Sequence, residues 1–101
     1  TGTGGSDLPD IEAEFSQPSV ARFQRGTCGM ARTQNPNSAN SQFFIMFAPA
    51  PSLDGQYTIW GRVISGMDVV DRIGAVPTGN KGPHQNVPVT PVVIRKASVE
   101  K

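Results

Sequence analysis

The ionisable and nucleophilic side chains of this sequence do not suggest a metal site or covalent catalysis. His84 is the only histidine and Cys28 the only cysteine, so neither a zinc site nor a nucleophile with a histidine base and an acidic partner is indicated. Asp68 and Asp71 would share one face of a helix, where carboxylates more often form a solvated surface than an acid and base pair. We therefore expect no metal and no cofactor, and we expect Cys28 to be a small buried hydrophobic residue.

A more informative feature is the mostly apolar segment from Ser41 to Ala48, in which Gln42 adds a polar side chain. Strand alternation puts two sets of side chains on opposite faces: Gln42, Phe44 and Met46 on one, and Phe43, Ile45 and Phe47 on the other. Both faces are too apolar for a half-solvated strand. Either the strand is covered on both faces, or one face is an exposed groove of the kind that binds peptides. The residues alone leave these alternatives open.

The elements that would position this segment are mostly β-strands. Valine and isoleucine supply 16 residues and leucine only 2, which favours sheet because β-branched side chains fit a pleated surface. Strands are predicted over 20–32, 41–48, 56–64 and 89–99, with polar loops over 34–40 and 78–88. Apolar residues then recur at every third position, at Met67, Val70 and Ile73. This helical spacing predicts one short amphipathic helix over 66–76.

Length and charge exclude several classes of protein. The 101 residues suit one domain, and 23 leucine, isoleucine, valine and phenylalanine residues are enough for a folded core. The 9 basic and 8 acidic residues are scattered, so we expect no nucleic-acid partner. No apolar run approaches the ~18 residues of a membrane span. No leader is visible, so we expect a cytoplasmic protein; a targeting signal upstream of Thr1 would change that expectation.

Five short motifs follow one another along the chain. They are Met30-Ala31, Asn37-Ser-Ala-Asn-Ser-Gln-Phe-Phe-Ile45, Leu53-Asp-Gly55, Trp60-Gly-Arg-Val63 and Gly66-Met-Asp-Val-Val-Asp-Arg-Ile73. Together they resemble the cyclophilin family of peptidyl-prolyl cis-trans isomerases, over residues 1–99. The resemblance implies a mostly β fold, a closed antiparallel β-barrel with a capping helix. Residues 1–101 would be the C-terminal portion of this single domain, supplying its C-terminal strands and one helix.

The resemblance also implies roles for individual residues. Gln42 and Phe44 would be catalytic, Gln42 by hydrogen-bonding the substrate backbone and Phe44 by forming the floor or wall of the proline pocket. Leu53 would close that pocket, and Tyr57 stands where the family often has histidine. The remaining substrate-binding positions would edge the groove and border the neighbouring specificity pocket: Ala31, Thr33 and Gly2. We expect Phe43 and Trp60 to be buried inside the barrel.

The sequence departs from the family pattern at several positions. Arg32 replaces a common asparagine, and one extra residue lies between it and Pro36. Ser52 stands where a tryptophan often contacts cyclosporin, which suggests that this drug would bind weakly. The family's catalytic arginine, a second pocket phenylalanine and a second glutamine belong to a preceding strand that is absent from this sequence. Arg32 is the only basic residue near the expected groove that could replace that arginine.

The resemblance implies an isomerase that acts on X-Pro bonds of protein substrates during folding. Rotation about an amide crosses a barrier of about 18–20 kcal/mol without making or breaking a bond, so a binding surface can be the catalyst. The chain would carry half of the proline pocket and would pair its open strand edges with an N-terminal fragment of the same domain or with another copy. The alternatives are a proline-peptide-binding module without catalysis, and an unrelated β-domain in which Gln42 and Phe44 are core residues.

Overall fold

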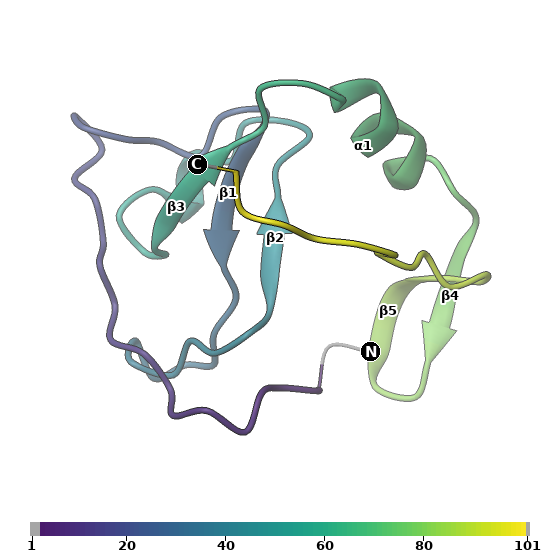
Figure 1. The fold of residues 1–101 in the computed structure, drawn as a ribbon, viewed down its shortest axis with the longest axis horizontal. Helices are drawn as coiled ribbons and strands as arrows, with labels where there is room; N and C mark the ends of the chain where they lie inside the picture. The colour runs from purple at the N-terminus through teal and green to yellow at the C-terminus, as the bar shows by residue number, and fades with distance from the viewer. Residues whose placement is uncertain (1–2, 101) are drawn as a thin grey trace.

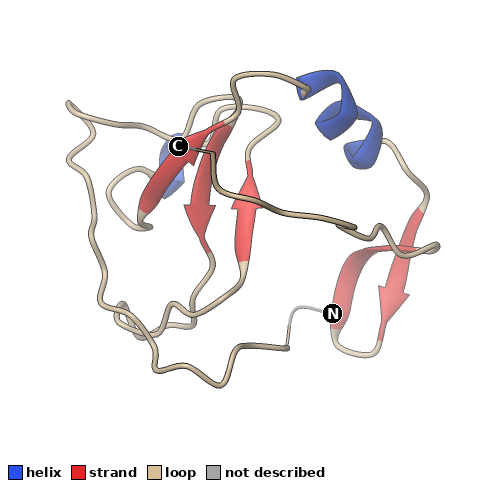
Figure 2. Cartoon of the chain, in the orientation of Figure 1, coloured by secondary structure: helices blue, strands red, loops and turns tan. Residues whose placement is uncertain are grey.

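Short strands joined by long connections make up the computed structural model, which describes residues 3–100 (Figures 1 and 2). In chain order the elements are β1 (Thr27–Met30), β2 (Phe43–Ile45), the 3-10 helix η1 (Pro51–Leu53), β3 (Ile59–Arg62), α1 (Met67–Gly74), β4 (Thr78–Lys81) and β5 (His84–Pro88). The described chain is therefore mostly β with one α-helix. Neither helix in this part of the chain is long and apolar enough to cross a membrane.

Three of the strands form an antiparallel sheet in the order β2-β1-β3. The central strand β1 has the sequence Thr-Cys-Gly-Met; its first three residues are buried and Met30 is half-buried. Gly29 lies opposite Phe44 of β2, and Cys28 lies opposite Gly61 of β3. The predicted strands at 20–32, 41–48 and 56–64 are confirmed, although each is shorter than expected because turn residues and prolines flank it.

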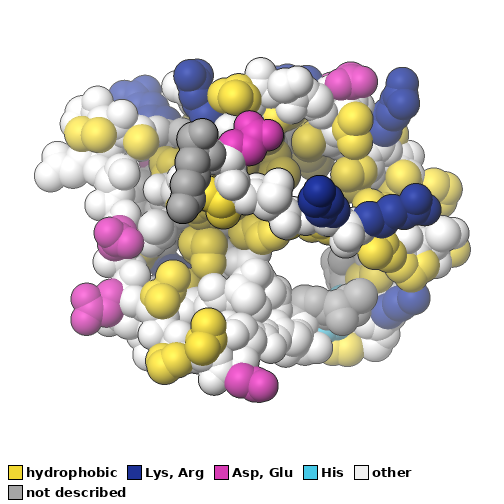
Figure 3. Space-filling view, viewed as in Figure 1, with side chains coloured by type: hydrophobic (Ala, Val, Ile, Leu, Met, Phe, Trp, Pro, Cys, Tyr) yellow, Lys and Arg dark blue, Asp and Glu magenta, His cyan; other side chains and the backbone are white. Residues whose placement is uncertain are grey.

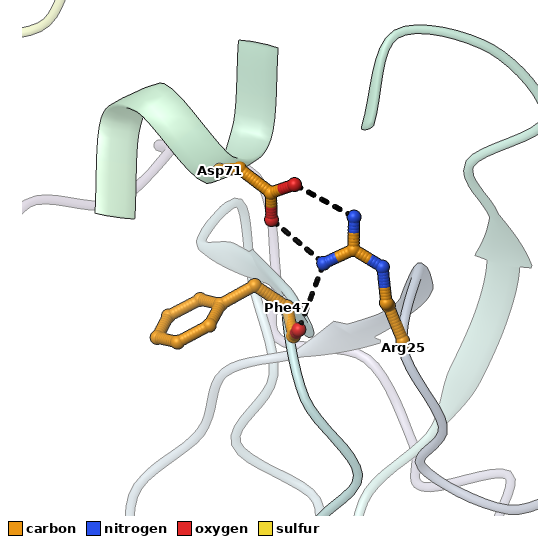
Figure 4. A network of polar contacts seen from close by, with 3 residues as sticks. All are labelled: Arg25, Phe47 and Asp71. Atoms are coloured by element: carbon orange, nitrogen blue, oxygen red, sulfur yellow. Dashed lines mark hydrogen bonds and ion pairs between the residues drawn. The ribbon is translucent and has the colours of Figure 1, made fainter. Parts of the chain in front are cut away.

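The helix α1 confirms the prediction for residues 66–76. It starts after Gly66, which adopts a φ of 89°. The helix is tied to the chain before β1 by an ion pair in which Arg25 Nη1 and Nη2 donate to the two carboxylate oxygens of Asp71, at 2.6 and 2.7 Å (Figure 4). Arg25 Nη1 also donates to the carbonyl of Phe47 at 3.1 Å. One guanidinium thus joins the helix to the segment that follows β2.

Two predictions for the C-terminal third are wrong. Residues 78–88, expected to be a loop, form the hairpin β4–β5, in which Gly82 and Asn86 have φ values of 57° and 58°. Residues 89–99, expected to be a strand, have no regular structure. Pro91 has no backbone N–H to donate to a neighbouring strand. A sequence rich in β-forming residues becomes a strand only where another strand pairs with it. In Figure 1 this segment (yellow) runs from the hairpin toward the sheet.

The expected closed barrel is absent from residues 3–100. The sheet ends at β2 and β3, and these two edges do not pair with each other or with the hairpin. As a result, Phe43 and Trp60, expected inside a barrel, are 44% and 54% exposed. Their rings meet edge to face with centroids 5.8 Å apart. The best-buried large side chain is Phe23, on the other side of the sheet from this aromatic pair.

Candidate functional site: a groove beside β1 and β2

A cavity of about 300 Å3 brings together four of the residues expected to bind substrate. Its lining consists of Ala31, Arg32, Phe44, Leu53 and Tyr57. Ala31 follows β1, Phe44 lies in β2, Leu53 ends η1 and Tyr57 precedes β3, so the walls come from β2, η1 and the residues that flank β1 and β3. Phe44 is half-buried. The structure places Phe44, Leu53 and Tyr57 around one partly open space, whereas Gln42, expected in the same groove, does not line it. We call this space the aromatic cavity.

The Phe44 ring is held in place by other aromatic rings and by a glycine. It stacks on Phe23 with centroids 5.5 Å apart and meets Tyr57 edge-on at 5.7 Å. Both phenylalanine rings cross the backbone of Gly29, where an added Cβ would lie 2.5 Å from Phe44 and 2.7 Å from Phe23. An aromatic ring over a glycine of the neighbouring strand fills the space that the missing side chain leaves. Gly29 is therefore a positioning residue that the sequence analysis missed.

The loop that carries Leu53 is anchored by Asp54. The backbone N–H of Phe23 donates to Asp54 Oδ1 at 2.6 Å. The Leu53-Asp-Gly55 motif contains an Asp-Gly pair, a common turn signal, and Gly55 adopts a φ of 73° in a turn. The Asp54 carboxylate thus links the η1 loop to the fully buried aromatic residue beneath Phe44. The sequence motif indicated the turn but gave no sign of this long-range hydrogen bond.

A second cavity, of about 360 Å3, adjoins the first and shares Ala31 and Arg32 with it. Its other lining residues are Thr3, Gly4, Thr33, Ser38, Asn40 and Gln42. Gln42 Nε2 donates to the carbonyl of Gly4, and its Oε1 accepts no hydrogen bond within residues 3–100. We call this space the polar cavity. Gly2, expected to border the specificity pocket beside the proline pocket, lies outside the described residues.

Hydrogen bonds of the Asn40 amide and the Ser38 hydroxyl hold the walls of the polar cavity in place. Asn40 accepts from the Ser6 N–H at 2.8 Å and donates to the Leu8 carbonyl at 3.0 Å, which ties the N-terminal segment to the groove. On the opposite wall, the Thr33 N–H donates to Ser38 Oγ at 2.9 Å, closing the loop 33–38 on itself. The sequence indicated a polar loop here, but it did not assign this role to Asn40.

The arrangement suits binding rather than proton transfer or covalent chemistry. Burial raises the pKa of the Cys28 thiol, so the protonated and weakly nucleophilic form is favoured. Neither cavity is lined by Cys28 or by His84. Residues 3–100 contain no group of histidine, cysteine and acidic side chains that could hold a metal ion. The groove offers an apolar aromatic wall beside one oriented amide, a combination that can grip a ring and accept a backbone N–H.

Comparisons with known proteins agree with this geometry. The sequence model of the family described as "Cyclophilin type peptidyl-prolyl cis-trans isomerase/CLD" matches residues 1–99. A Brucella abortus protein named "Probable peptidyl-prolyl cis-trans isomerase" is 56% identical over 99 residues, covering 98% of this chain and 47% of that protein. Peptidyl-prolyl cis-trans isomerase B of Escherichia coli is 45% identical over 85 residues, covering 76% of this chain and 52% of that protein.

A solved structure of the same family resembles this chain in its fold. A cyclophilin type peptidyl-prolyl cis-trans isomerase of Cryptosporidium parvum, crystallised in the presence of the dipeptide Ala-Pro, superposes with a TM-score of 0.73 at 29% identity. The match covers 88% of this chain and 55% of the parasite protein. The chain thus spans about half the length of the relatives it matches. The family model matches nearly the whole chain, and the relatives are named as members of the same class of isomerase. The chain therefore belongs to the cyclophilin-type peptidyl-prolyl cis-trans isomerase family.

Proposed function

We propose that this chain forms one side of the substrate groove of a prolyl isomerase, with the proline ring of an X-Pro segment seated against Phe44. The observation that supports this most strongly is the aromatic cavity, in which Phe44, Leu53 and Tyr57 surround a space beside Ala31. The Cryptosporidium parvum relative was crystallised in the presence of Ala-Pro, a ligand of the chemistry that we propose here.

In the proposed mechanism the groove holds the proline ring and the preceding residue by different contacts. The aromatic cavity grips the ring through apolar contact, while Gln42 Oε1, which accepts no hydrogen bond within residues 3–100, accepts a backbone N–H of the substrate. Isomerisation needs only rotation about the amide, so a site that binds the twisted amide more tightly than either planar form lowers the barrier of about 18–20 kcal/mol.

We also propose that residues 1–101 are the C-terminal portion of a larger domain, whose other portion supplies the arginine that donates to the twisted amide. We do not assign this role to Arg32, because its bonds to the carbonyls of Gln56 and Thr33 hold the guanidinium over the Tyr57 ring. The length of the relatives supports this proposal, since the match covers only 47% of the Brucella abortus protein.

The proposal is tested by measuring peptide binding and isomerisation separately. The full chain is titrated with an Ala-Pro peptide by NMR, alone and with the N-terminal half of the Brucella abortus relative added. We expect weak binding by the chain alone, and catalysed cis-trans exchange only after the second polypeptide is added. Binding without any catalysis in either case would favour the proline-peptide-binding module. No binding in either case would reject the proposed groove.

The open side of β2 leads us to propose where such a partner would sit. A cavity of about 720 Å3 lies there, lined mainly by apolar residues of β2, of the segment after it, of α1 and of the C-terminal segment: Phe43, Phe44, Ile45, Phe47, Val70, Ile73, Val92 and Ile94. Figure 3 shows hydrophobic side chains gathered beside an opening in one face of the molecule. We propose that an N-terminal portion of the domain, or a second copy, covers this surface. Light scattering that shows a stable monomer with the fold intact would contradict this.

We further propose weak binding of cyclosporin. Ser52 is exposed in η1, next to Leu53. The tryptophan ring that could cover the drug is therefore missing at this position. Ser52→Trp should strengthen cyclosporin binding measured by calorimetry, whereas Ser52→Thr should not. Equal affinities of these two variants would show that position 52 does not decide binding of the drug.

A further inference from the structure

Arg32 occupies a junction in the groove. It lines the aromatic cavity, the polar cavity and a third cavity of about 540 Å3, whose other lining residues are Thr33, Gln34, Ser52, Leu53, Gln56 and Tyr57. The third cavity meets the aromatic cavity at Leu53 and Tyr57. Its lining contains no carboxylate, so Arg32 provides its only charge. We call it the flanking cavity.

The Arg32 side chain is fixed in this position. Its Nε and Nη2 donate to the carbonyl of Gln56 at 3.2 and 2.6 Å, and its Nη1 donates to the carbonyl of Thr33 at 2.8 Å. The guanidinium lies over the Tyr57 ring, 4.8 Å from its centroid. A guanidinium held in this way has already lost its rotamer freedom, so a ligand that binds it bears little of that entropic cost.

The Arg32 charge is not neutralised by the described chain. The ion pair found within residues 3–100 joins Arg25 to Asp71, which leaves Arg32 without a carboxylate partner there. A guanidinium has five N–H donors, of which three are used by the carbonyls of Gln56 and Thr33. Two donors and a positive charge therefore remain beside the aromatic cavity, and the group that would match them is a carboxylate.

We propose that Arg32 gives the groove a preference for X-Pro segments that carry an acidic side chain next to the proline dipeptide. This inference rests on the proposed function, because it needs a proline seated in the aromatic cavity. The acidic side chain would reach the flanking cavity and accept from the free Nη donors of Arg32. Arg32 would then determine specificity, without touching the amide that rotates.

The test compares the binding of matched peptides to the full chain. Two pairs of Ala-Pro peptides carry glutamate or its uncharged isostere glutamine, either before the alanine or after the proline. For one of these two positions we expect the glutamate peptide to bind about fivefold more tightly at low salt, the size of a surface ion pair. This ratio should approach one at high salt, because screening weakens the charge interaction.

Three variants separate a local effect from general attraction by a positive protein. Arg32→Gln should remove the glutamate preference, Arg32→Lys should keep part of it, and Arg62→Gln should leave it intact. Arg62 is a matched control because it is exposed on β3 and lines neither the aromatic nor the flanking cavity. Unchanged binding of the glutamine peptides shows that each variant keeps its groove, and Arg32→Lys supplies the answer if Arg32→Gln does not fold.

The outcomes distinguish this inference from the proposed function. If the glutamine peptides bind but the glutamate to glutamine ratio is near one at both positions, the specificity role of Arg32 is wrong and the groove stands. If Arg62→Gln lowers the ratio as much as Arg32→Gln, the preference comes from overall charge and the inference is also overturned. If no peptide binds, the groove itself fails, and the role of Arg32 fails with it.

Discussion

Phe43 and Phe44 are neighbours in β2, and they point into two different environments. The Phe44 ring is half-buried between Phe23 and Tyr57 and crosses Gly29. The Phe43 ring is 44% exposed, and its aromatic partner is Trp60, which is itself 54% exposed. One face of the strand is therefore completed by nearby parts of the chain, whereas the other face is not.

The difference shows where each face obtains its partners. Every ring that packs on Phe44 comes from residues 23–57, within one sheet and its connecting loops. The face of Phe43 opens onto the cavity bounded by α1 and the unpaired C-terminal segment. A binding wall can thus be built from a local segment, but a closed interior needs strands that residues 3–100 do not supply. The predictions below test this contrast between the two faces.

The largest effect is expected for Phe44→Ala. Truncation of a packed phenylalanine typically costs about 3–5 kcal/mol, and partial exposure should put Phe44 at the lower end of that range. Peptide binding should fall further than stability because the ring is the proposed proline wall. Urea unfolding and peptide titration measure the two losses. Tyr57→Phe is the control, because it keeps the ring that meets Phe44 edge-on. A variant that loses stability but keeps peptide affinity would show that Phe44 is only a core residue.

A smaller but more specific effect is expected for Gly29→Ala. The added methyl group would overlap both rings, and overpacking of this kind typically costs about 1–3 kcal/mol. Gly61→Ala is the matched control in the same sheet, because a Cβ there meets no atom within 4 Å. NMR shifts of the Phe44 ring should change in the first variant and not in the second. Equal destabilisation by both would show that backbone freedom, not ring placement, is what the glycines provide.

On the open face, Phe43→Ser should have little effect on the stability of the chain alone. The pair with Trp60 is edge to face, an interaction worth about 0.5–1.5 kcal/mol, and both rings already contact water. Binding of a hydrophobic dye should decrease. The same variant should weaken association with the N-terminal half of the Brucella abortus relative. A large stability loss in the isolated chain would mean that this face is closed in solution.

The smallest effect concerns the exposed ion pair between Arg25 and Asp71. The hydrogen bonds from Arg25 lower the pKa of Asp71 below its ordinary value of 3.8. The pair should therefore stabilise the fold above that pH, and its contribution should disappear as pH falls through the lowered pKa. Thermal unfolding of Asp71→Asn should show a shallower loss of Tm on acidification. Asp68→Asn, which removes a carboxylate from the same helix, is expected to keep the original acid profile.

The residues of the segment 41–48 left a covered strand and an exposed groove as alternatives, and only the family resemblance favoured the groove. Alternation along residues 41–48 correctly separated Phe44 from Phe43, and the helix followed from the spacing of Met67, Val70 and Ile73. The exposure of Phe43 could not be predicted, because alternation reports which face a residue shares and not what covers that face. The hairpin at 78–88 was missed because its sequence is polar and rich in turn residues, and a pairing of two such strands leaves little hydrophobic pattern.

The N-terminal segment is attached to the groove mainly by side-chain amides, and this has a consequence for hydrogen exchange. The Ser6 N–H donates to the Asn40 side chain, and the Ala13 N–H donates to the Asn37 side chain. The Ala31 N–H instead donates to the backbone carbonyl of Gln42, the residue before β2. Rotation of two asparagine side chains would free the first pair without disturbing the sheet. The backbone amide hydrogens of Ser6 and Ala13 should then exchange with solvent through local opening. The amide hydrogen of Ala31 should exchange only when the sheet separates. The wall of the polar cavity near Ser6 can thus open locally while the backbone bond from the Ile11 N–H to the Ala39 carbonyl keeps the segment attached.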